Sequence, residues 1–129
     1  MVEIKARAWN DGVMANVRSI LMLHGIVQSV EVFVSGGKTE VWSIFDSVEF
    51  YTGVQDKDNV EIYEGDIVVD ETGYVAEIYF SKILFAWCTI NAQGERLYLN
   101  EVAWIFEDGK CSTVKRIGNI HDNPEMMRQ

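Results

Sequence analysis

Proline, cysteine, histidine and long apolar runs are scarce in this sequence, and each shortage excludes a class of protein. The 129 residues include one proline, Pro124, and two histidines, His24 and His121. Two cysteines, Cys88 and Cys111, are too few and too far apart for a disulfide framework or a structural zinc site. No apolar run reaches transmembrane length, and the charged N-terminal residues lack a signal-peptide core. We therefore expect a cytoplasmic protein without a membrane partner.

Positive charge is also scarce. The 11 Lys and Arg residues are outnumbered by 20 Asp and Glu residues, which gives a formal net charge of −9. This balance argues against strong binding to a nucleic-acid backbone. Ten of the acids lie between Glu40 and Glu71, where only Lys57 opposes them. The simplest interpretation is a solubilising face, and the alternatives are a docking surface for a basic partner or a mimic of nucleic acid.

Motifs of the common enzyme classes are missing as well. The chain has no nucleophile elbow, phosphate loop, dinucleotide glycine pattern or His-Glu-x-x-His sequence. The segment Asp56–Asn59 begins like a calcium loop, but Glu61 stands at the glycine position and Ile67 at the bidentate acid position. We expect no metal ion, no cofactor and no catalytic activity. The remaining candidate for paired-carboxylate chemistry is the segment Glu61–Asp66, with its three acids.

Hydrophobic residues make up 48% of the chain and aromatic residues 12%, and most of them follow strand patterns. Alternation of apolar and polar residues predicts half-buried strands over residues 2–9 and 27–34. Further strands are expected at residues 13–17, 20–23, 40–45, 48–52, 61–63, 66–69, 74–80, 83–90 and 115–120. The best helix candidate is residues 97–106, which Asp108-Gly109 would end.

Glycine, Asn and Asp separate these strands at short intervals. We expect Asn59 to adopt the left-handed conformation at the end of a polar turn, and Gly65 to have a positive φ at a sharp bend. The chain shows no repeat, linker or low-complexity tract. These features predict one domain over residues 1–129, mainly β, built as an antiparallel pseudo-barrel or a pair of curled sheets.

The four tryptophans are the largest apolar side chains and are expected in the core. They are Trp9, Trp42, Trp87 and Trp104. An exposed tryptophan would instead mark an interface with another molecule. Cys88, in an apolar segment, is expected to be a small buried residue.

Three segments together resemble the YopX family, a set of small proteins from bacteriophages and prophages. They are Ile4–Trp9, Tyr51–Val68 and Ile117–Glu125, and their order and spacing span almost the whole chain. The matching positions that we single out are Trp9, Tyr51, Gly53, Asp56, Tyr63, Gly65, Asp66, Gly118, Asn119 and Pro124. The resemblance implies a β-rich pseudo-barrel with a short helical cap, a phage or prophage context and a capacity for homo-oligomerisation. It implies no reaction.

We therefore expect a non-enzymatic phage or prophage accessory protein that acts through protein–protein contacts. Its partner would be a second copy of itself, as a homo-oligomer, or a protein of the host or phage. One alternative is a nucleic-acid-binding small barrel, for which Lys110, Lys115 and Arg116 form the only basic cluster. The other is a small-molecule enzyme that uses carboxylates between Glu61 and Asp66.

Overall fold

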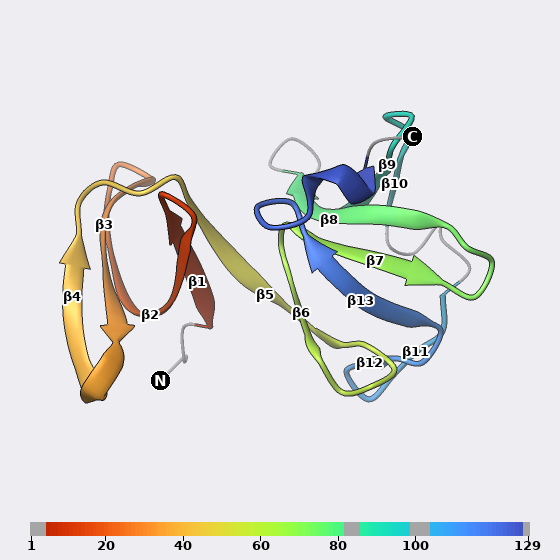
Figure 1. Ribbon diagram of the computed structural model, residues 1–129, viewed down its shortest axis with the longest axis horizontal. Coiled ribbons are helices and arrows are strands. Elements are labelled where there is room, and N and C mark those ends of the chain that lie inside the picture. Colours follow the sequence, from red (N-terminus) through yellow and green to blue (C-terminus); the bar gives the residue numbers. More distant parts are fainter. Residues whose placement is uncertain (1–4, 82–85, 99–103, 128–129) are drawn as a thin grey trace. The chain divides into compact units, whose positions relative to one another are not determined.

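The computed structural model describes residues 5–81, 86–98 and 104–127, and most of its regular structure is β-strand (Figure 1). The chain divides into two compact units, Met1–Phe50 and Tyr51–Gln129, called here the N-terminal and the C-terminal unit. Each unit has its own cluster of buried hydrophobic side chains. Strand β5 (Ser47–Gln55) begins in the first unit and ends in the second. The single domain over residues 1–129 stays a prediction.

The N-terminal unit is an antiparallel meander with the strand order β5-β1-β2-β3-β4. Its other strands are β1 Ala6–Asn10, β2 Val13–Leu23, β3 Ile26–Val34 and β4 Lys38–Trp42. Asp11 and Gly12 join β1 to β2 with φ values of 51° and 78°, and His24 and Gly25 join β2 to β3 with 53° and 76°. Two consecutive positive φ values are typical of the tight hairpin turn whose twist matches that of the paired strands.

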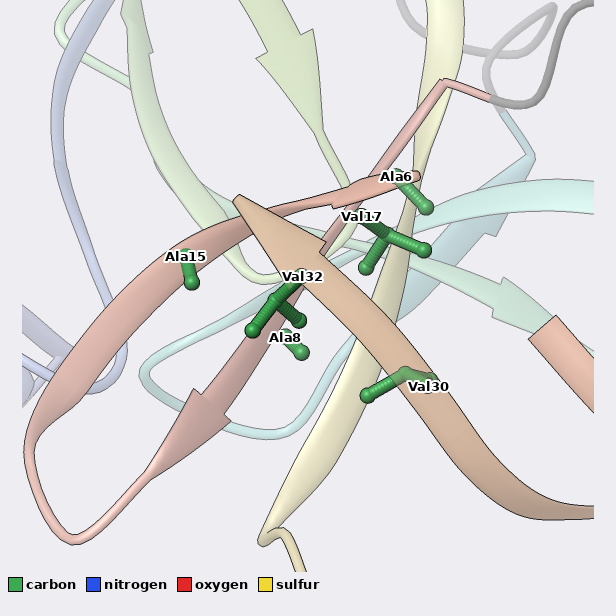
Figure 2. Close-up of a cluster of buried hydrophobic side chains, with 6 residues drawn as sticks. All are labelled: Ala6, Ala8, Ala15, Val17, Val30 and Val32. Carbon is green, nitrogen blue, oxygen red and sulfur yellow. The ribbon is translucent and has the colours of Figure 1, made fainter. Parts of the chain in front are cut away.

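Small side chains fill the core of the N-terminal unit. The cluster consists of Ala6, Ala8, Ala15, Val17, Val30 and Val32 (Figure 2). Alternate residues of a strand point to the same face, so these positions of β1, β2 and β3 cover one face of the sheet. Phe45 and the half-buried Trp42 pack against the cluster from its margin. This core therefore contains no fully buried side chain larger than valine.

The C-terminal unit contains a five-stranded antiparallel sheet with the order β10-β9-β8-β7-β13, and β6 and β12 pair with the second half of β5. Its strands are β6 Glu61–Tyr63, β7 Asp66–Asp70, β8 Val75–Ser81, β9 Ala86–Asn91, β10 Arg96–Tyr98, β11 Phe106–Glu107, β12 Lys110–Cys111 and β13 Val114–Asn119. Its core cluster is Ile62, Val68, Ile78, Trp104, Cys111 and Val114. Cys88 is buried and free, so its expected burial is confirmed.

The mainly β architecture is confirmed, but the helix over residues 97–106 is wrong where the structure describes it. Leu97 and Tyr98 belong to β10 and pair with Thr89 and Cys88 of β9, and Phe106 belongs to β11. Residues 99–103 lie outside the described residues. A short apolar segment with helix-like spacing also suits a strand when a neighbouring strand supplies hydrogen bonds. Pairing with β9 therefore decides the structure of residues 96–98.

Neither the helical cap nor a closed barrel is found in the described part of the chain. Its helical segments are two short 3₁₀ turns, η1 (Ser35–Gly37) and η2 (Pro124–Met127). The strand orders of the two sheets are open, so the structure is a pair of sheets rather than a barrel. Within the described ranges, no helix is long and apolar enough to cross a membrane.

Two expected strands differ in detail from the structure. The segments 13–17 and 20–23 form one strand, because a β-bulge between Val17 and Ser19 shifts the alternation without ending the pairing with β3. The alternation over residues 2–9 predicts Arg7 on the polar face of a half-buried strand, but every residue over 6–9 of β1 is buried. The strand over 83–90 is described from Ala86, and residues 2–4 and 83–85 lie outside the described residues.

Candidate functional site

Asp56 organises the polar turn between β5 and β6. Its side chain is buried, and Oδ1 accepts hydrogen bonds from the backbone N–H groups of Asp58 and Val60 at 2.8 and 2.9 Å. Oδ2 accepts a third bond, from the backbone N–H of Arg116 on β13, at 2.8 Å. A buried carboxylate needs such donors to replace its lost water. Asp56 therefore connects this turn to β13, and Asn59 in the same turn has the predicted left-handed conformation, with φ of 65°.

Asp66 plays a similar part at the bend between β6 and β7. Its side chain is fully buried, and Oδ2 accepts a 2.7 Å hydrogen bond from the backbone N–H of Tyr63. Its Oδ1 lies 3.1 Å from Nε of Arg116. Arg116 is therefore held through its backbone by Asp56 and through its side chain by Asp66. These two acids, 10 positions apart in the sequence, meet on one residue of the last strand.

Gly65 allows the chain to bend immediately before Asp66. Its φ is 87°, which confirms the predicted positive value. The Gly65 N–H donates to the carbonyl of Ile78 at 2.7 Å, and the Gly65 carbonyl accepts from the N–H of Ile120 at 2.9 Å. The bend is thus fastened to β8 on one side and to the end of β13 on the other.

Gly53 lies in an irregular part of β5. The pairing of β5 with β6 shifts in register between Tyr51 and Gln55, and Gly53 has φ of 85° within this stretch. A positive φ is typical of a residue in a bulge, and residues with a side chain rarely adopt it. The rings of Tyr51 and its cross-strand partner Tyr63 have centroids 5.6 Å apart and form a tilted aromatic pair.

The C-terminal segment forms a turn around Asn119. The Oδ1 atom of Asn119 accepts hydrogen bonds from the backbone N–H groups of His121 and Asp122, both at 2.9 Å. Asn123 closes the turn, because its N–H donates to the Asn119 carbonyl at 2.8 Å. A Cβ atom on Gly118 would lie only 2.5 Å from Oδ1 of Asn123. Gly118 is therefore required by a close approach rather than by its φ.

Arg7, Trp9 and Glu49 form a buried polar group in the N-terminal unit. Oε1 of Glu49 accepts hydrogen bonds from Nε of Arg7 at 2.8 Å and from Nε1 of Trp9 at 2.7 Å. Arg7 and Glu49 are direct cross-strand partners, and the Arg7 guanidinium lies 5.7 Å from the Trp9 ring centroid. Sequence reasoning predicted the burial of Trp9 but not this group, whose partners lie about 40 residues apart. The one local signal was an arginine within a run of Ala and Trp residues.

One of the three candidate catalytic acids, Asp66, is buried and bonded within the chain. Both oxygens of Asp66 already have partners, so acid–base chemistry with Glu61 or Glu64 would require Asp66 to leave Tyr63 and Arg116. Three of the ten acids between Glu40 and Glu71, namely Glu49, Asp56 and Asp66, are buried. The stretch is therefore less of a continuous acidic surface than its sequence suggests. In the described part of the chain, no three His, Cys, Asp or Glu side chains are grouped to hold a metal ion.

The feature that sequence reasoning missed is an apolar surface. The exposed large hydrophobic side chains of the described residues number 13, and ten of them lie in the N-terminal unit. These ten are Val13, Met14, Leu21, Met22, Leu23, Ile26, Phe33, Val41, Ile44 and Phe50. No tryptophan is among them, since Trp9 and Trp104 are buried and the other two are half-buried. The sequence did contain one signal of this surface. The apolar run at residues 20–23 stands directly before the turn His24-Gly25, so its last residues lie at the tip of a hairpin, where few other strands can cover them.

Comparison with known proteins identifies one family and one shared fold. The family model described as YopX protein matches residues 7–128. The crystal structure of protein EF1440 from Enterococcus faecalis is similar, with a TM-score of 0.59 and 23% sequence identity, and the match covers 96% of this chain and 97% of that chain. At this identity the likeness shows the fold alone. None of the curated proteins matches the chain significantly.

Proposed function

This chain belongs to the YopX protein family, and from that premise we propose that it is a non-enzymatic accessory protein that acts through protein–protein contacts as a homo-oligomer. The proposal includes a phage or prophage origin and a cytoplasmic setting in a bacterial host. Its partner is a second copy of the chain or, in a further complex, a protein of the phage or the host.

The observation that carries this proposal is the concentration of exposed apolar side chains in the N-terminal unit. Ten of the 13 such side chains of the described residues lie there, although this unit is the shorter one. Apolar surface in water costs about 25 cal/mol per Å², and the cost is recovered when another protein covers it. Large exposed apolar patches therefore mark interaction sites.

Charge distribution supports the same unit as the contact region. Residues 1–50 carry four basic and six acidic side chains, whereas residues 51–129 carry seven and fourteen, which gives net charges of −2 and −7. Two copies of the chain repel each other least where the net charge is small. The acidic C-terminal unit remains available for a basic partner.

The alternative functions have less support. A nucleic-acid site would need the basic cluster near the C-terminus, but the Arg116 guanidinium is paired with Asp66, which leaves Lys110 and Lys115. A carboxylate enzyme that used Asp66 would need this side chain on an accessible surface, and Asp66 is buried, which leaves Glu61 and Glu64.

Light scattering coupled to size-exclusion chromatography tests the proposal. One chain has a mass of 14.7 kDa, and we expect the protein at micromolar concentration to have the mass of two or more chains in a single defined assembly. A mass of one chain at every concentration would contradict homo-oligomerisation. Turnover of a small molecule by the purified protein, lost on substitution of Glu61 or Glu64, would contradict the non-enzymatic part.

A further inference from the structure

One face of the β2-β3-β4 sheet carries a group of exposed apolar side chains, called here the outer face. It consists of Leu21, Leu23, Ile26, Phe33 and Val41, each between 48% and 66% exposed. Their register places them on the side opposite the core: Leu21 pairs with Ser29 and Val41 pairs with Glu31, and Ser29, Glu31 and Phe33 are alternate residues of β3. The register shifts between Leu21 and Met22, so Leu23 and its partner Ile26 stay on this face although Ile26 and Phe33 are an odd number of positions apart. Side chains at paired positions, and at positions two apart on a strand, share a face.

Glu31 lies among these apolar residues, but its charge is satisfied within the chain. Its carboxylate accepts hydrogen bonds from Oγ1 of Thr39 at 3.0 Å, Oγ of Ser19 at 3.1 Å and Nη1 of Arg18 at 3.1 Å. The bonds from Thr39 and Ser19, followed by the Arg18 charge, lower the pKa of Glu31 below its ordinary value. A carboxylate that already has several donors is easier to cover, because fewer of its bonds to water must be replaced.

We propose that the outer face is the surface through which two copies of this chain associate, with the same residues contributed by each copy. This inference rests on the proposed homo-oligomer and assigns its contact surface. A twofold interface is self-complementary, so it requires a face that tolerates a second copy of itself. The outer face meets this requirement, because its one acid is paired with Arg18 and the other exposed side chains there are apolar or hydroxyl-bearing.

The size of the outer face fits this occupant. At 48% to 66% exposure, the five apolar residues together leave on the order of 500 Å² accessible, the scale of the largest apolar patch on a typical monomer. With Ser19, Ser29, Thr39 and the Arg18–Glu31 pair beside them, the face approaches the ~800 Å² that each partner buries in a standard interface. A strongly basic partner would find little net charge here, and an anionic lipid surface would be repelled by a chain of net charge −9.

A matched pair of lysine substitutions tests the inference on the full chain. Ile26 on the outer face and Ile105 in the C-terminal unit are 64% and 59% exposed, so Lys replaces an equally exposed isoleucine at each position. We expect Ile26→Lys to raise the dimer dissociation constant by about tenfold or more, and Ile105→Lys to leave it near the wild-type value. Analytical ultracentrifugation over a concentration series measures the constant, and circular dichroism establishes that each variant folds.

Hydroxyl-radical footprinting of the wild-type protein gives a second readout that does not depend on a variant folding. Oxidation of Leu23, Ile26 and Phe33 should fall as the protein concentration rises, while that of Ile105 stays constant. An oligomer that persists in Ile26→Lys, with unchanged footprints on the outer face, would overturn this inference and leave the proposed homo-oligomer intact. A wild-type monomer at all concentrations would overturn both. Flotation of the monomer with phosphatidylcholine vesicles, lost in Ile26→Lys, would assign the face to lipid instead.

Discussion

The two units of this chain differ in the size of their buried side chains and in the number of apolar side chains that they leave exposed. The core cluster of the N-terminal unit consists of alanine and valine, and ten large apolar side chains of this unit are exposed to water. The C-terminal unit buries Trp104, Ile62 and Ile78, and only three of its described large apolar side chains are exposed. Because hydrophobic stabilisation scales with the apolar area removed from water, the second core contributes more for each residue. The first unit gains most from a partner that covers its surface.

The turns of the two units differ as well. In the N-terminal unit the β1-β2 and β2-β3 hairpins are closed by two-residue turns of positive φ. The C-terminal unit uses one five-residue turn three times, beginning at Asp56, Asp70 and Asn91. In each, the first side chain accepts bonds from the backbone N–H groups two and four residues later. The fourth residue is left-handed, as Asn59, Gly73 or Gly94.

Turn geometry gives a physical reason for the residue types of Tyr51–Val68, one of the three segments that resemble the family. The segment Tyr51–Val68 contains the one such turn whose acid is fully buried and also bonds a distant strand. Its residue types are set by hydrogen bonding and backbone conformation, which few side chains satisfy. The outer face of the N-terminal unit is set by apolar contact, which several residue types satisfy equally well.

The largest predicted effect is on Trp9, the one large aromatic side chain buried in the N-terminal unit. Trp9→Ala should lower the free energy of unfolding by about 3–5 kcal/mol, because it opens a cavity and removes a donor from Glu49. Trp9→Phe keeps most of the volume and should cost less. Urea denaturation measures both values, and hydrogen exchange by segment locates the loss, which we expect in β1–β3. A wild-type midpoint for Trp9→Ala would show that this side chain is not in the core.

A somewhat smaller effect is expected from Asp56, and it tests whether the three similar turns are equivalent. Asp56→Ala should cost about 3 kcal/mol, because three backbone N–H groups lose their acceptor in a buried site. Asp70→Ala removes the first residue of the same turn where it is half-buried and also accepts bonds from Trp104 and Thr72 side chains, and should cost about 2 kcal/mol. Equal losses in the two variants would show that the deeper burial of Asp56 and its bond to Arg116 contribute no more than the two additional bonds of Asp70. Thermal or urea unfolding of both variants provides the measurement.

Local features were predictable from the sequence, and contacts between distant residues were not. Asn59 and Gly65 have the expected conformations because turn chemistry involves only neighbouring residues. Arg7 was expected in solvent because its partner Glu49 lies 42 positions away. The same holds for Arg116, which appeared to belong to a basic cluster although Asp56, 60 positions earlier, holds its backbone. Such pairs depend on the register between strands that are distant in the sequence, and local sequence patterns do not reveal this register.

The apolar run at residues 20–23 was predicted as a strand, and it is one. Whether its side chains are buried depends on which strands stack against it, and strand patterns do not reveal this. Ile20 packs against the core, whereas Leu21 and Leu23 are exposed on the outer face. Residues 97–98 were missed for the same reason, because pairing with β9 outweighed a helix-like spacing.

The smallest predicted effect concerns pH and the second of the three turns. Burial alone would raise the pKa of Asp70, but hydrogen bonds from Thr72, Trp104 and Tyr74 lower it below the ordinary value of 3.8. A carboxylate with a lowered folded-state pKa contributes stability that is present above the unfolded value and is lost as pH falls through the folded value. Asp70→Asn should therefore cost about 1–2 kcal/mol at neutral pH and almost nothing in strong acid.

The wild type and Asp70→Asn should have the same stability in strong acid because protonated Asp70 and the introduced asparagine present the same kinds of polar groups. Each keeps a carbonyl oxygen that accepts the bonds of the turn, as the Asn91 side chain does in the third turn. Each also places a donor where Oδ2 of ionised Asp70 accepts the 3.0 Å bond from Nε1 of Trp104, so that bond is lost. Glu71→Gln removes the same charge from the exposed neighbouring residue and should change stability by less than about 0.5 kcal/mol at either pH. Unfolding curves for the three proteins at neutral and acid pH supply the comparison. A difference between wild type and Asp70→Asn that stays constant with pH would mean that the Asp70 charge does not contribute to the stability of this turn.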